Sequence, residues 1–178
     1  MCIRDRGLET AHRIVVPGVG AFGKAMQKME QLGFVDALST AVISHQTPVL
    51  GICLGMQLML AIGEEGGTTA GLGWIEGHVR RLVPSQGERV PHIGWNTVEF
   101  DESCPLFHSL APDTDFYFVH SYHVTPDDPS VIVGRTPFAG GFASAIRKGS
   151  LYGVQFHPEK SQIAGFTVLE NFLRCGGQ

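Results

Sequence analysis

A cysteine at position 53 has a glycine two residues away on each side, Gly51 and Gly55. The apolar run before it predicts a buried strand over residues 48–52, and the pattern after it predicts a helix over 54–62. A strand, a sharp turn at the cysteine and an immediate helix would form a nucleophile elbow, with the sulfur at its tip. The helix N-terminus would favour the thiolate. A buried structural cysteine is the alternative.

A second group of chemically capable residues lies about a hundred positions downstream. The segment 151–156 predicts a short strand, and Pro158 favours extended backbone at His157. Residues i and i+2 of an extended chain share one side, so Glu159 can orient one imidazole nitrogen and leave the other free. Taken separately, they could be a strand-end histidine and a solvated carboxylate. Together with Cys53 they predict a triad of nucleophile, base and orienting group.

A third segment could supply hydrogen-bond donors to such a triad. Residues 13–22 predict a strand that enters the glycine-rich loop Pro17–Gly20 and then a helix. Backbone N–H groups of this loop, together with the amide of Leu54 after the nucleophile, could form an oxyanion hole. The loop lacks the Lys-Ser/Thr of a phosphate-binding loop. An ordinary strand-to-helix turn is the alternative.

The pattern of apolar and polar residues in the rest of the sequence predicts the helices and strands that would position the candidate catalytic residues. A helical pattern over 22–44 should split near Gly33, and Ser161 should cap a final helix. The apolar stripe expected on that helix is Ile163, Phe166, Leu169 and Leu173. Short strands are expected at 75–83, 97–100, 116–124, 131–133, 142–147 and 151–156. We therefore expect an α/β fold with a mostly parallel central sheet flanked by helices and an added antiparallel layer.

Two of these stretches, Gly51–Gln57 and Gly153–Glu159, resemble motifs of the class I, triad-type glutamine amidotransferases, which have a flavodoxin-like fold. Within that family the chain is similar to the glutaminase subunits of imidazole glycerol phosphate synthase, from histidine biosynthesis. The other motifs that carry the likeness are Pro17–Gly20, Pro91–Asn96, Tyr117–Tyr122 and His157–Ser161. The resemblance covers most of the chain, from about Ile14 to about Leu173.

The resemblance implies a role for each matching residue. Cys53 would attack the carboxamide of L-glutamine to give a thioester and ammonia, with His157 as the base and Glu159 as its partner. Amides of Val19, Gly20 and Leu54 would form the oxyanion hole. Glutamine would be bound by Gly20, Gln57, Glu65, His120 and Ser121. From the residues alone, a histidine on such a core strand is more often a satisfied core residue than a catalytic one, and this is the alternative for His120. The partner subunit would be met by Trp95, Asn96 and Lys160.

The resemblance also implies a partner. In the family, a (β/α)8-barrel cyclase subunit takes the ammonia through a sealed passage and makes imidazole glycerol phosphate and an aminoimidazole-carboxamide ribonucleotide (AICAR). Glutamine hydrolysis is typically weak until this partner is bound. The family uses no cofactor in the glutaminase subunit.

The N-terminus departs from the family pattern. The family's first strand, loop and helix are absent, and the first residues resemble no part of it. We therefore expect a non-family segment at 1–12 and a single amidotransferase domain at 13–178. The lost loop normally lines the glutamine site and touches the partner.

The amino-acid composition favours some classes of protein and argues against others. The 178 residues are 43% hydrophobic and 17% charged, which is typical of one globular domain. A net charge of -4 and the absence of basic blocks argue against nucleic acid, and no apolar run reaches membrane-spanning length. The four scattered cysteines form no Cys-x-x-Cys pair, which argues against disulfides and zinc. We expect a cytoplasmic protein.

Three alternatives stay open at this stage. The chain could be the glutaminase subunit of another amidotransferase, acting for an acceptor such as chorismate or a pyridoxal precursor. It could be a cysteine peptidase or esterase on the same architecture. It could also be an inactive fragment that only binds the partner.

Overall fold

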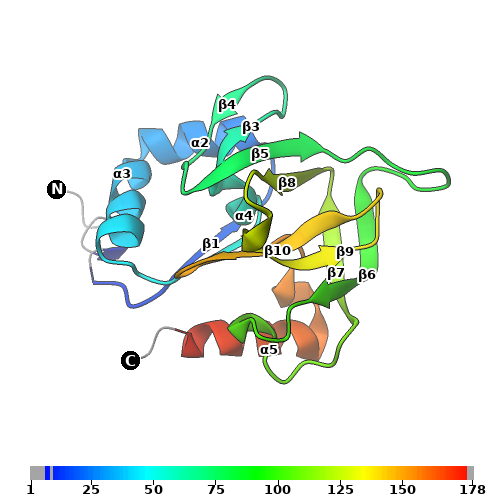
Figure 1. Ribbon diagram of the computed structural model, residues 1–178. Helices are drawn as coiled ribbons and strands as arrows, with labels where there is room; N and C mark the ends of the chain where they lie inside the picture. The colour runs from blue at the N-terminus through cyan, green and yellow to red at the C-terminus, as the bar shows by residue number, and fades with distance from the viewer. Residues whose placement is uncertain (1–6, 9, 176–178) are drawn as a thin grey trace.

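The computed structural model describes residues 7, 8 and 10–175. They form a mixed sheet of eleven strands, with α2, α3 and α4 on one side and α5 on the other (Figure 1). The helices are α2 (Phe22–Gln31), α3 (Phe34–Ser39), α4 (Leu54–Leu58) and α5 (Gln162–Arg174). The strands are β1 (Ile14–Gly18), β2 (Val49–Cys53), β3 (Leu60–Gly63), β4 (Thr69–Ala70), β5 (Ile75–Arg81), β6 (His92–Phe100), β7 (Thr114–His120), β8 (Tyr122–Pro126), β9 (Ile132–Thr136), β10 (Phe142–Lys148) and β11 (Leu151–Val154). This arrangement confirms the predicted α/β class.

The sheet brings the predicted site residues to one edge. Its main path runs β1-β2-β11-β10-β8-β5-β3-β4, and β2 lies parallel to both β1 and β11. In register, Gly18 stands beside Cys53, and Ile52 stands beside Val154. Because parallel strands end at the same edge, the loops after β1, β2 and β11 meet there.

Strand β2 is buried along its whole length because both of its faces are covered. Val49 packs into the core beneath α2, α3 and α4, whereas Leu50 and Ile52 pack into the core beneath α5. This burial fixes the strand that delivers Cys53.

Two helix predictions had different outcomes. The split at Gly33 is confirmed, since its φ of 71° ends α2 and starts α3, which continues into a π-helical turn at Thr40–Ser44. The helix expected over 54–62 was too long: α4 stops at Leu58 and β3 follows. Strand β3 pairs with β5, so long-range sheet pairing overrides local helical preference.

Ser161 is the N-cap residue of α5, as expected, but two side-chain expectations at this helix were wrong. Ser161 does not cap α5 with its side chain: its hydroxyl donates to the His157 carbonyl and accepts from the Tyr117 N–H. The stripe through Ile163 and Phe166 does not face the core, because these side chains are 82% and 61% exposed. The buried face of α5 carries Gly165, Val168, Asn171 and Phe172 instead.

The later strands also differ in detail from the expectation. The strand expected over 116–124 is two strands, β7 and β8, divided at Ser121. Strand β6 starts at His92, five residues before the expected start at Thr97, and pairs with β7. Short 3₁₀ turns lie at Pro105–Phe107, Pro129–Val131 and Pro158–Lys160.

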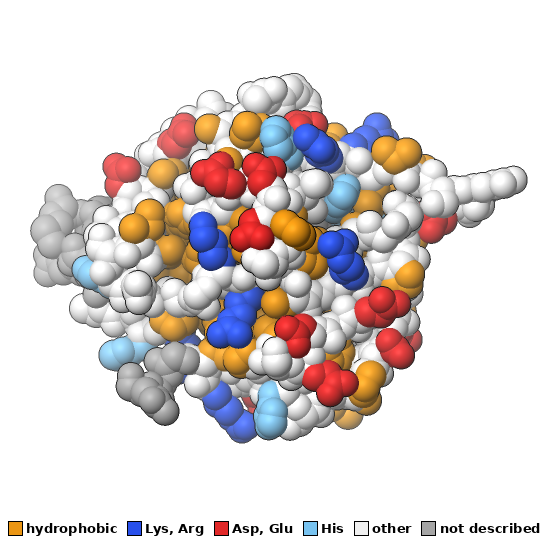
Figure 2. All heavy atoms as spheres, viewed as in Figure 1, with side chains coloured by type: hydrophobic (Ala, Val, Ile, Leu, Met, Phe, Trp, Pro, Cys, Tyr) orange, Lys and Arg blue, Asp and Glu red, His pale blue; other side chains and the backbone are white. Residues whose placement is uncertain are grey.

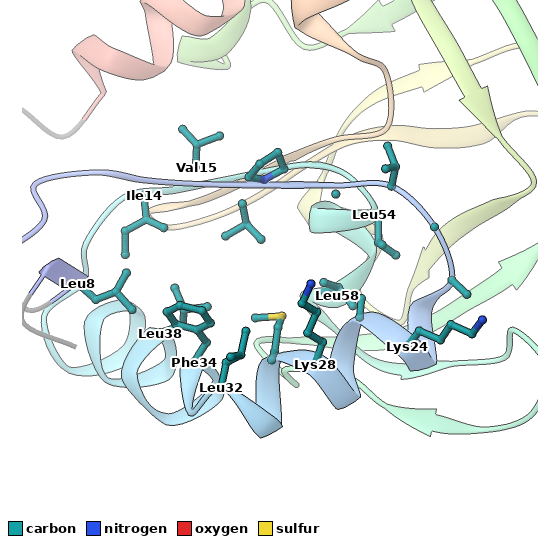
Figure 3. Close-up of a pocket in the computed structure, with 18 residues that line it drawn as sticks. Leu8, Ile14, Val15, Lys24, Lys28, Leu32, Phe34, Leu38, Leu54 and Leu58 are labelled. Atoms are coloured by element: carbon teal, nitrogen blue, oxygen red, sulfur yellow. The ribbon is translucent and has the colours of Figure 1, made fainter. Parts of the chain in front are cut away.

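The surface combines mixed charge with one apolar groove. On the face seen in Figure 2, acidic and basic side chains are intermixed. A groove of about 650 Å³ lies between β1 and the helices α2 and α3, where Ile14, Phe34 and Leu38 point into it while Val15 points away (Figure 3). Among the described residues, no helix is long and apolar enough to cross a membrane.

Candidate active site

Cys53 occupies a sharp turn between β2 and α4. Its φ of 53° and ψ of -107° are rare for a residue with a side chain. A Cβ at position 51 would lie 2.6 Å from the Gly55 carbonyl carbon and the Met56 nitrogen, and a Cβ at position 55 would collide with the Val16 carbonyl oxygen. Both glycines therefore permit the close backbone approach that the turn requires. This geometry is that of a nucleophile elbow.

A cavity of about 450 Å³ opens beside this turn. It gathers most of the residues that sequence reasoning expected around glutamine, from the loops after β1, β2, β3 and β7. The lining residues are Val19, Gly20, Ala21, Cys53, Leu54, Gln57, Glu65, Val119, His120, Ser121 and Tyr122. The larger groove in Figure 3 contains no titratable side chain except two lysines, so it lacks acid–base groups of this kind.

The sulfur of Cys53 is a protonated thiol at neutral pH. Burial raises the pKa of Cys53 from 9.0 to about 11, and the Glu159 carboxylate adds to the rise. Hydrogen bonds from the Leu54 amide and the Gln155 side chain act in the opposite direction but are weaker. The Leu54 amide at the start of α4 does favour the thiolate, as expected, but desolvation outweighs it and the net shift of the pKa is upward. Attack on a substrate requires a base.

His157 has the orientation that a base requires. Its Nδ1 lies 2.7 Å from Glu159 Oε1, and its side chain is 3% exposed. Its backbone N–H donates to the Tyr117 carbonyl at 2.8 Å. Its Nε2 is buried and has no hydrogen-bond partner within the described part of the chain. The imidazole is thus held on one side and free on the other, as the spacing of His157 and Glu159 predicted.

The residues of the predicted triad approach from two neighbouring strands. Cys53 ends β2, and His157 follows three residues after the end of β11, the strand beside it. Across the residues that the structure covers, no hydrogen bond joins the Cys53 sulfur to His157. The sulfur instead accepts a bond of 3.4 Å from Gln155 Nε2.

Two polar residues expected to bind substrate already have protein partners. Gln57 Nε2 donates to the Tyr122 carbonyl at 2.9 Å and to Gln155 Oε1 at 3.0 Å. Glu65 Oε2 accepts from the Phe22 N–H at 2.7 Å and so caps the start of α2. One carboxylate oxygen of Glu65 is therefore already occupied at the cavity wall.

His120 is buried at the cavity wall and neutral. Burial is the main cause that lowers its pKa to about 3, and the nearby His92 lowers it further. Its Nδ1 lies 2.8 Å from the Tyr122 carbonyl. Since a carbonyl only accepts, Nδ1 carries the proton.

Sequence reasoning missed Gln155, which is fully buried and touches the sulfur. A signal existed. Gln155 lies two residues before His157 in extended chain, and such residues point to the same side. The same argument that paired His157 with Glu159 therefore extends to Gln155.

The residues expected to face a partner divide between two faces of β6. Trp95 is 48% exposed and packs edge-on against Tyr117, whose ring has Lys160 Nζ 5.9 Å from its centre. The Asn96 side chain points inward, where its Nδ2 lies 3.2 Å from His92 Nε2. The outward cluster of Ile93, Trp95, Tyr117 and Lys160 is called the β6 face below.

Comparison with known proteins agrees with this geometry. A family model described as "Glutamine amidotransferase class-I" matches residues 3–175. The chain is 47% identical to "Imidazole glycerol phosphate synthase subunit HisH" of Moorella thermoacetica, over 93% of this chain and 77% of the relative. It is 49% identical to the subunit of the same name in Chlorobium luteolum, over 92% and 81% of the two chains. A HisH 1 subunit of Campylobacter jejuni is 41% identical over 95% and 84%.

Solved structures support the fold. A chain described as a glutamine amidotransferase superposes with a TM-score of 0.70 at 17% identity, covering 94% of this chain and 82% of that one. The glutaminase domain of Trypanosoma brucei CTPS, solved with acivicin, gives a TM-score of 0.63 at 17% identity, over 96% and 74%. The chain belongs to the class-I glutamine amidotransferases and, among them, to the HisH subunits of imidazole glycerol phosphate synthase.

Proposed function

We propose that Cys53, His157 and Glu159 perform the glutamine hydrolysis of this imidazole glycerol phosphate synthase subunit. His157 Nε2 takes the proton of the Cys53 thiol as the sulfur attacks the side-chain carboxamide carbon of glutamine. The tetrahedral intermediate collapses, the C–N bond breaks, and His157 returns the proton to the leaving nitrogen as ammonia. Water, deprotonated by His157, then cleaves the thioester and releases glutamate and the free thiol.

The negative oxygen of each intermediate requires donors that are already in place. The amide of Leu54, directly after the nucleophile, and the Val19–Gly20 segment line the same cavity as Cys53. We assign the oxyanion hole to these backbone groups, since fixed dipoles in a buried site stabilise developing charge without reorganising.

The glutamine would occupy the cavity beside Cys53. A volume of about 450 Å³ accommodates a free amino acid, and Glu65 offers a carboxylate for its ammonium group. His120, Ser121 and Gln57 would line its amino-acid end. A neutral His120 suits this place because it adds no charge beside the substrate.

The β6 face is where we place the partner cyclase, a (β/α)8 barrel. Ile93 is 61% and Trp95 48% exposed, and aromatic side chains are enriched at interface centres. Ammonia released in the cavity would pass to the barrel from this side.

The observation that carries the triad is the state of His157. Its imidazole is buried at the sheet edge where Cys53 ends β2. Glu159 holds one nitrogen, and the other has no partner among the residues that the structure describes. A buried nitrogen without a partner is costly unless a substrate or reacting group uses it.

The test is a glutaminase assay with and without the barrel cyclase subunit, after a check of folding by circular dichroism. We expect Cys53→Ala to lower stimulated glutamine turnover by at least about a thousandfold while leaving cyclase binding intact. Cys104→Ala is the matched control, because Cys104 is also buried but does not line the cavity beside Cys53. Turnover retained by Cys53→Ala would remove Cys53 from the mechanism.

A further inference from the structure

We propose that Gln155 is a positioning residue for the Cys53 sulfur, anchored to strand β6 by a buried chain of hydrogen bonds. The chain passes through Gln57, the Tyr122 carbonyl, His120, His92 and Asn96. This inference rests on the proposed function and deepens it, because it concerns the same nucleophile.

The Gln155 side chain is fixed at both ends. Its Nε2 donates to Cys53 Sγ at 3.4 Å, and its Oε1 accepts from Gln57 Nε2 at 3.0 Å. Its backbone N–H donates to the Ser144 carbonyl at 2.9 Å, and no part of the residue is exposed to solvent. The amide therefore has one orientation available to it, with its N–H aimed at the sulfur.

Gln57 extends the chain to the wall of the cavity. Its amide nitrogen has two N–H groups, and these go to Gln155 Oε1 and the Tyr122 carbonyl. The same carbonyl accepts from His120 Nδ1 at 2.8 Å. One backbone oxygen thus joins the glutamine pair near the sulfur to the histidine at the cavity wall.

The two histidines extend the chain to β6 with a single direction of donation. His120 Nε2 lies 3.1 Å from His92 Nδ1, and His92 Nε2 lies 3.2 Å from Asn96 Nδ2. Since His120 donates to Tyr122 through Nδ1, its Nε2 must accept from His92, and His92 in turn must accept from Asn96. The Asn96 amide is held in this orientation because its Oδ1 accepts from the Thr97 N–H at 2.9 Å. Each ring nitrogen has one partner.

Burial makes this chain rigid. Gln57, His92 and His120 are 5%, 5% and 6% exposed, so water does not compete for these bonds. The His92 ring stacks between Phe118 and Phe138, at centroid distances of 4.9 and 4.1 Å. The opposite face of the same strand carries Ile93 and Trp95. The position of the sulfur is therefore linked, bond by bond, to the strand beneath the β6 face.

The chemical effect at the sulfur follows from the direction of the first bond. When His157 removes the thiol proton, the sulfur becomes an anion, and the N–H of Gln155 then donates to a charged acceptor, which strengthens that bond. The charges that face the sulfur are the Glu159 carboxylate, which opposes the thiolate, and the Lys160 ammonium, which favours it. Gln155 provides a neutral donor of fixed geometry beside these opposed charges.

The first test measures the reactivity of Cys53 directly. Iodoacetamide labelling of Cys53 in the full chain is followed by mass spectrometry across a range of pH. We expect Gln155→Met, similar in length but without a donor, to raise the apparent pKa of Cys53 by about one unit and slow labelling at neutral pH about tenfold. Gln155→Glu, nearly the same shape, replaces the donor by a carboxylate and should slow labelling at least as much. In glutaminase assays with the cyclase subunit, kcat should fall while KM changes little.

The second test asks whether the chain extends to β6. His92→Phe preserves an aromatic ring between Phe118 and Phe138 but removes both ring nitrogens. We expect His92→Phe to slow Cys53 labelling about threefold. In the double variant His92→Phe/Gln155→Met, Cys53 should be labelled no more slowly than in Gln155→Met alone. Phe138→Leu is the matched control, because it changes the same stack without breaking a hydrogen bond, and its labelling rate should equal that of the wild type.

The outcomes separate this inference from the proposed function. Wild-type labelling rates and pH profiles in both folded Gln155 variants would overturn the positioning role. Additive effects of Gln155→Met and His92→Phe would overturn the link to β6. Turnover retained by Cys53→Ala would overturn the proposed function, whereas a shifted labelling profile in Gln155→Met would still support the contact with the sulfur.

Discussion

Cys53 combines two unfavourable properties for the resting protein. Its backbone lies at φ 53°, where a side chain is strained, and its sulfur is buried enough to raise its pKa to about 11. Such strain persists only when the surrounding structure requires it. Here the requirement comes from the close backbone contacts at Gly51 and Gly55. The benefit is positional, since the turn places the sulfur against the cavity. The buried thiol stays protonated until His157 receives its proton.

The raised pKa of Cys53 predicts a pH-dependent loss of stability. Below pH 9.0 the thiol is protonated in both the folded and the unfolded chain, so its contribution is constant. Between pH 9.0 and about 11 the unfolded chain loses this proton while the folded protein retains it, so the free energy of unfolding falls. The fall should amount to roughly 2–3 kcal/mol more in the wild type than in Cys53→Ala. Urea unfolding of the wild type and Cys53→Ala at several pH values in this range measures the difference. The prediction would be contradicted if the free energy of unfolding changed with pH equally in both proteins.

At the scale of elements, the site depends on how closely α4 crosses β1 and β2. Helix α4 is five residues long, too short to be stable alone, and is held by the strands beneath it. Gly55 faces the Val16 carbonyl of β1 without room for a methyl group. This contact holds the loop after β1, with the amides proposed for the oxyanion hole, against Cys53.

Gly55→Ala should therefore destabilise the protein strongly. The added Cβ has only backbone to displace, so we expect a loss of about 2–4 kcal/mol in the free energy of unfolding, measured in urea by circular dichroism. Gly23→Ala is the control: that Cβ, on α2, would meet only the Thr69 hydroxyl, at 3.2 Å. It should stay within about 1 kcal/mol of the wild type. Equal stability of the two variants would mean that α4 can move away from β1.

The helices and strands show where the local sequence pattern was sufficient to predict the structure and where it was not. Gly33 divides a helix because a residue with positive φ suits a helix end, and this is a local property. The end of α4 at Leu58 and the strand at Leu60 come instead from pairing with β5, which is distant in sequence. The exposed Ile163 and Phe166 of α5 show the same limit, since an apolar stripe has no fixed relation to the core until the helix docks.

For the whole molecule, the cavity and the β6 face are linked through β6 and β7. His92 and His120 are paired in register across these strands, and so are Trp95 and Tyr117, with the first pair facing inward and the second outward. The groove along β1 runs from α3 to the loop after β1, where Val19, Gly20 and Leu54 also line the Cys53 cavity (Figure 1, Figure 3). The apolar groove therefore adjoins the cavity of the reacting groups, whereas the proposed partner face lies on β6 and β7.

Trp95→Ala should weaken binding of the cyclase subunit roughly 30-fold, because tryptophan is enriched among the few side chains that carry most of the binding energy of an interface. Isothermal titration with the barrel subunit measures this effect, and glutamine turnover at saturating partner checks that the site is intact. Ile43→Ala is the control, since Ile43 is 66% exposed on the turn after α3, away from β6. If both variants bind as the wild type does, the partner lies on another face.

The sequence by itself determined the chemistry and its order along the chain. The glycines around Cys53 specify a tight elbow, and the spacing of His157 and Glu159 specifies an oriented imidazole, because both depend on bond geometry over a few residues. Only the tertiary structure decided that burial raises the pKa of the Cys53 thiol, that Gln155 touches it and that Asn96 points toward His92. Desolvation and hydrogen bonding between distant strands depend on which segments the fold places side by side, and no local pattern contains that information.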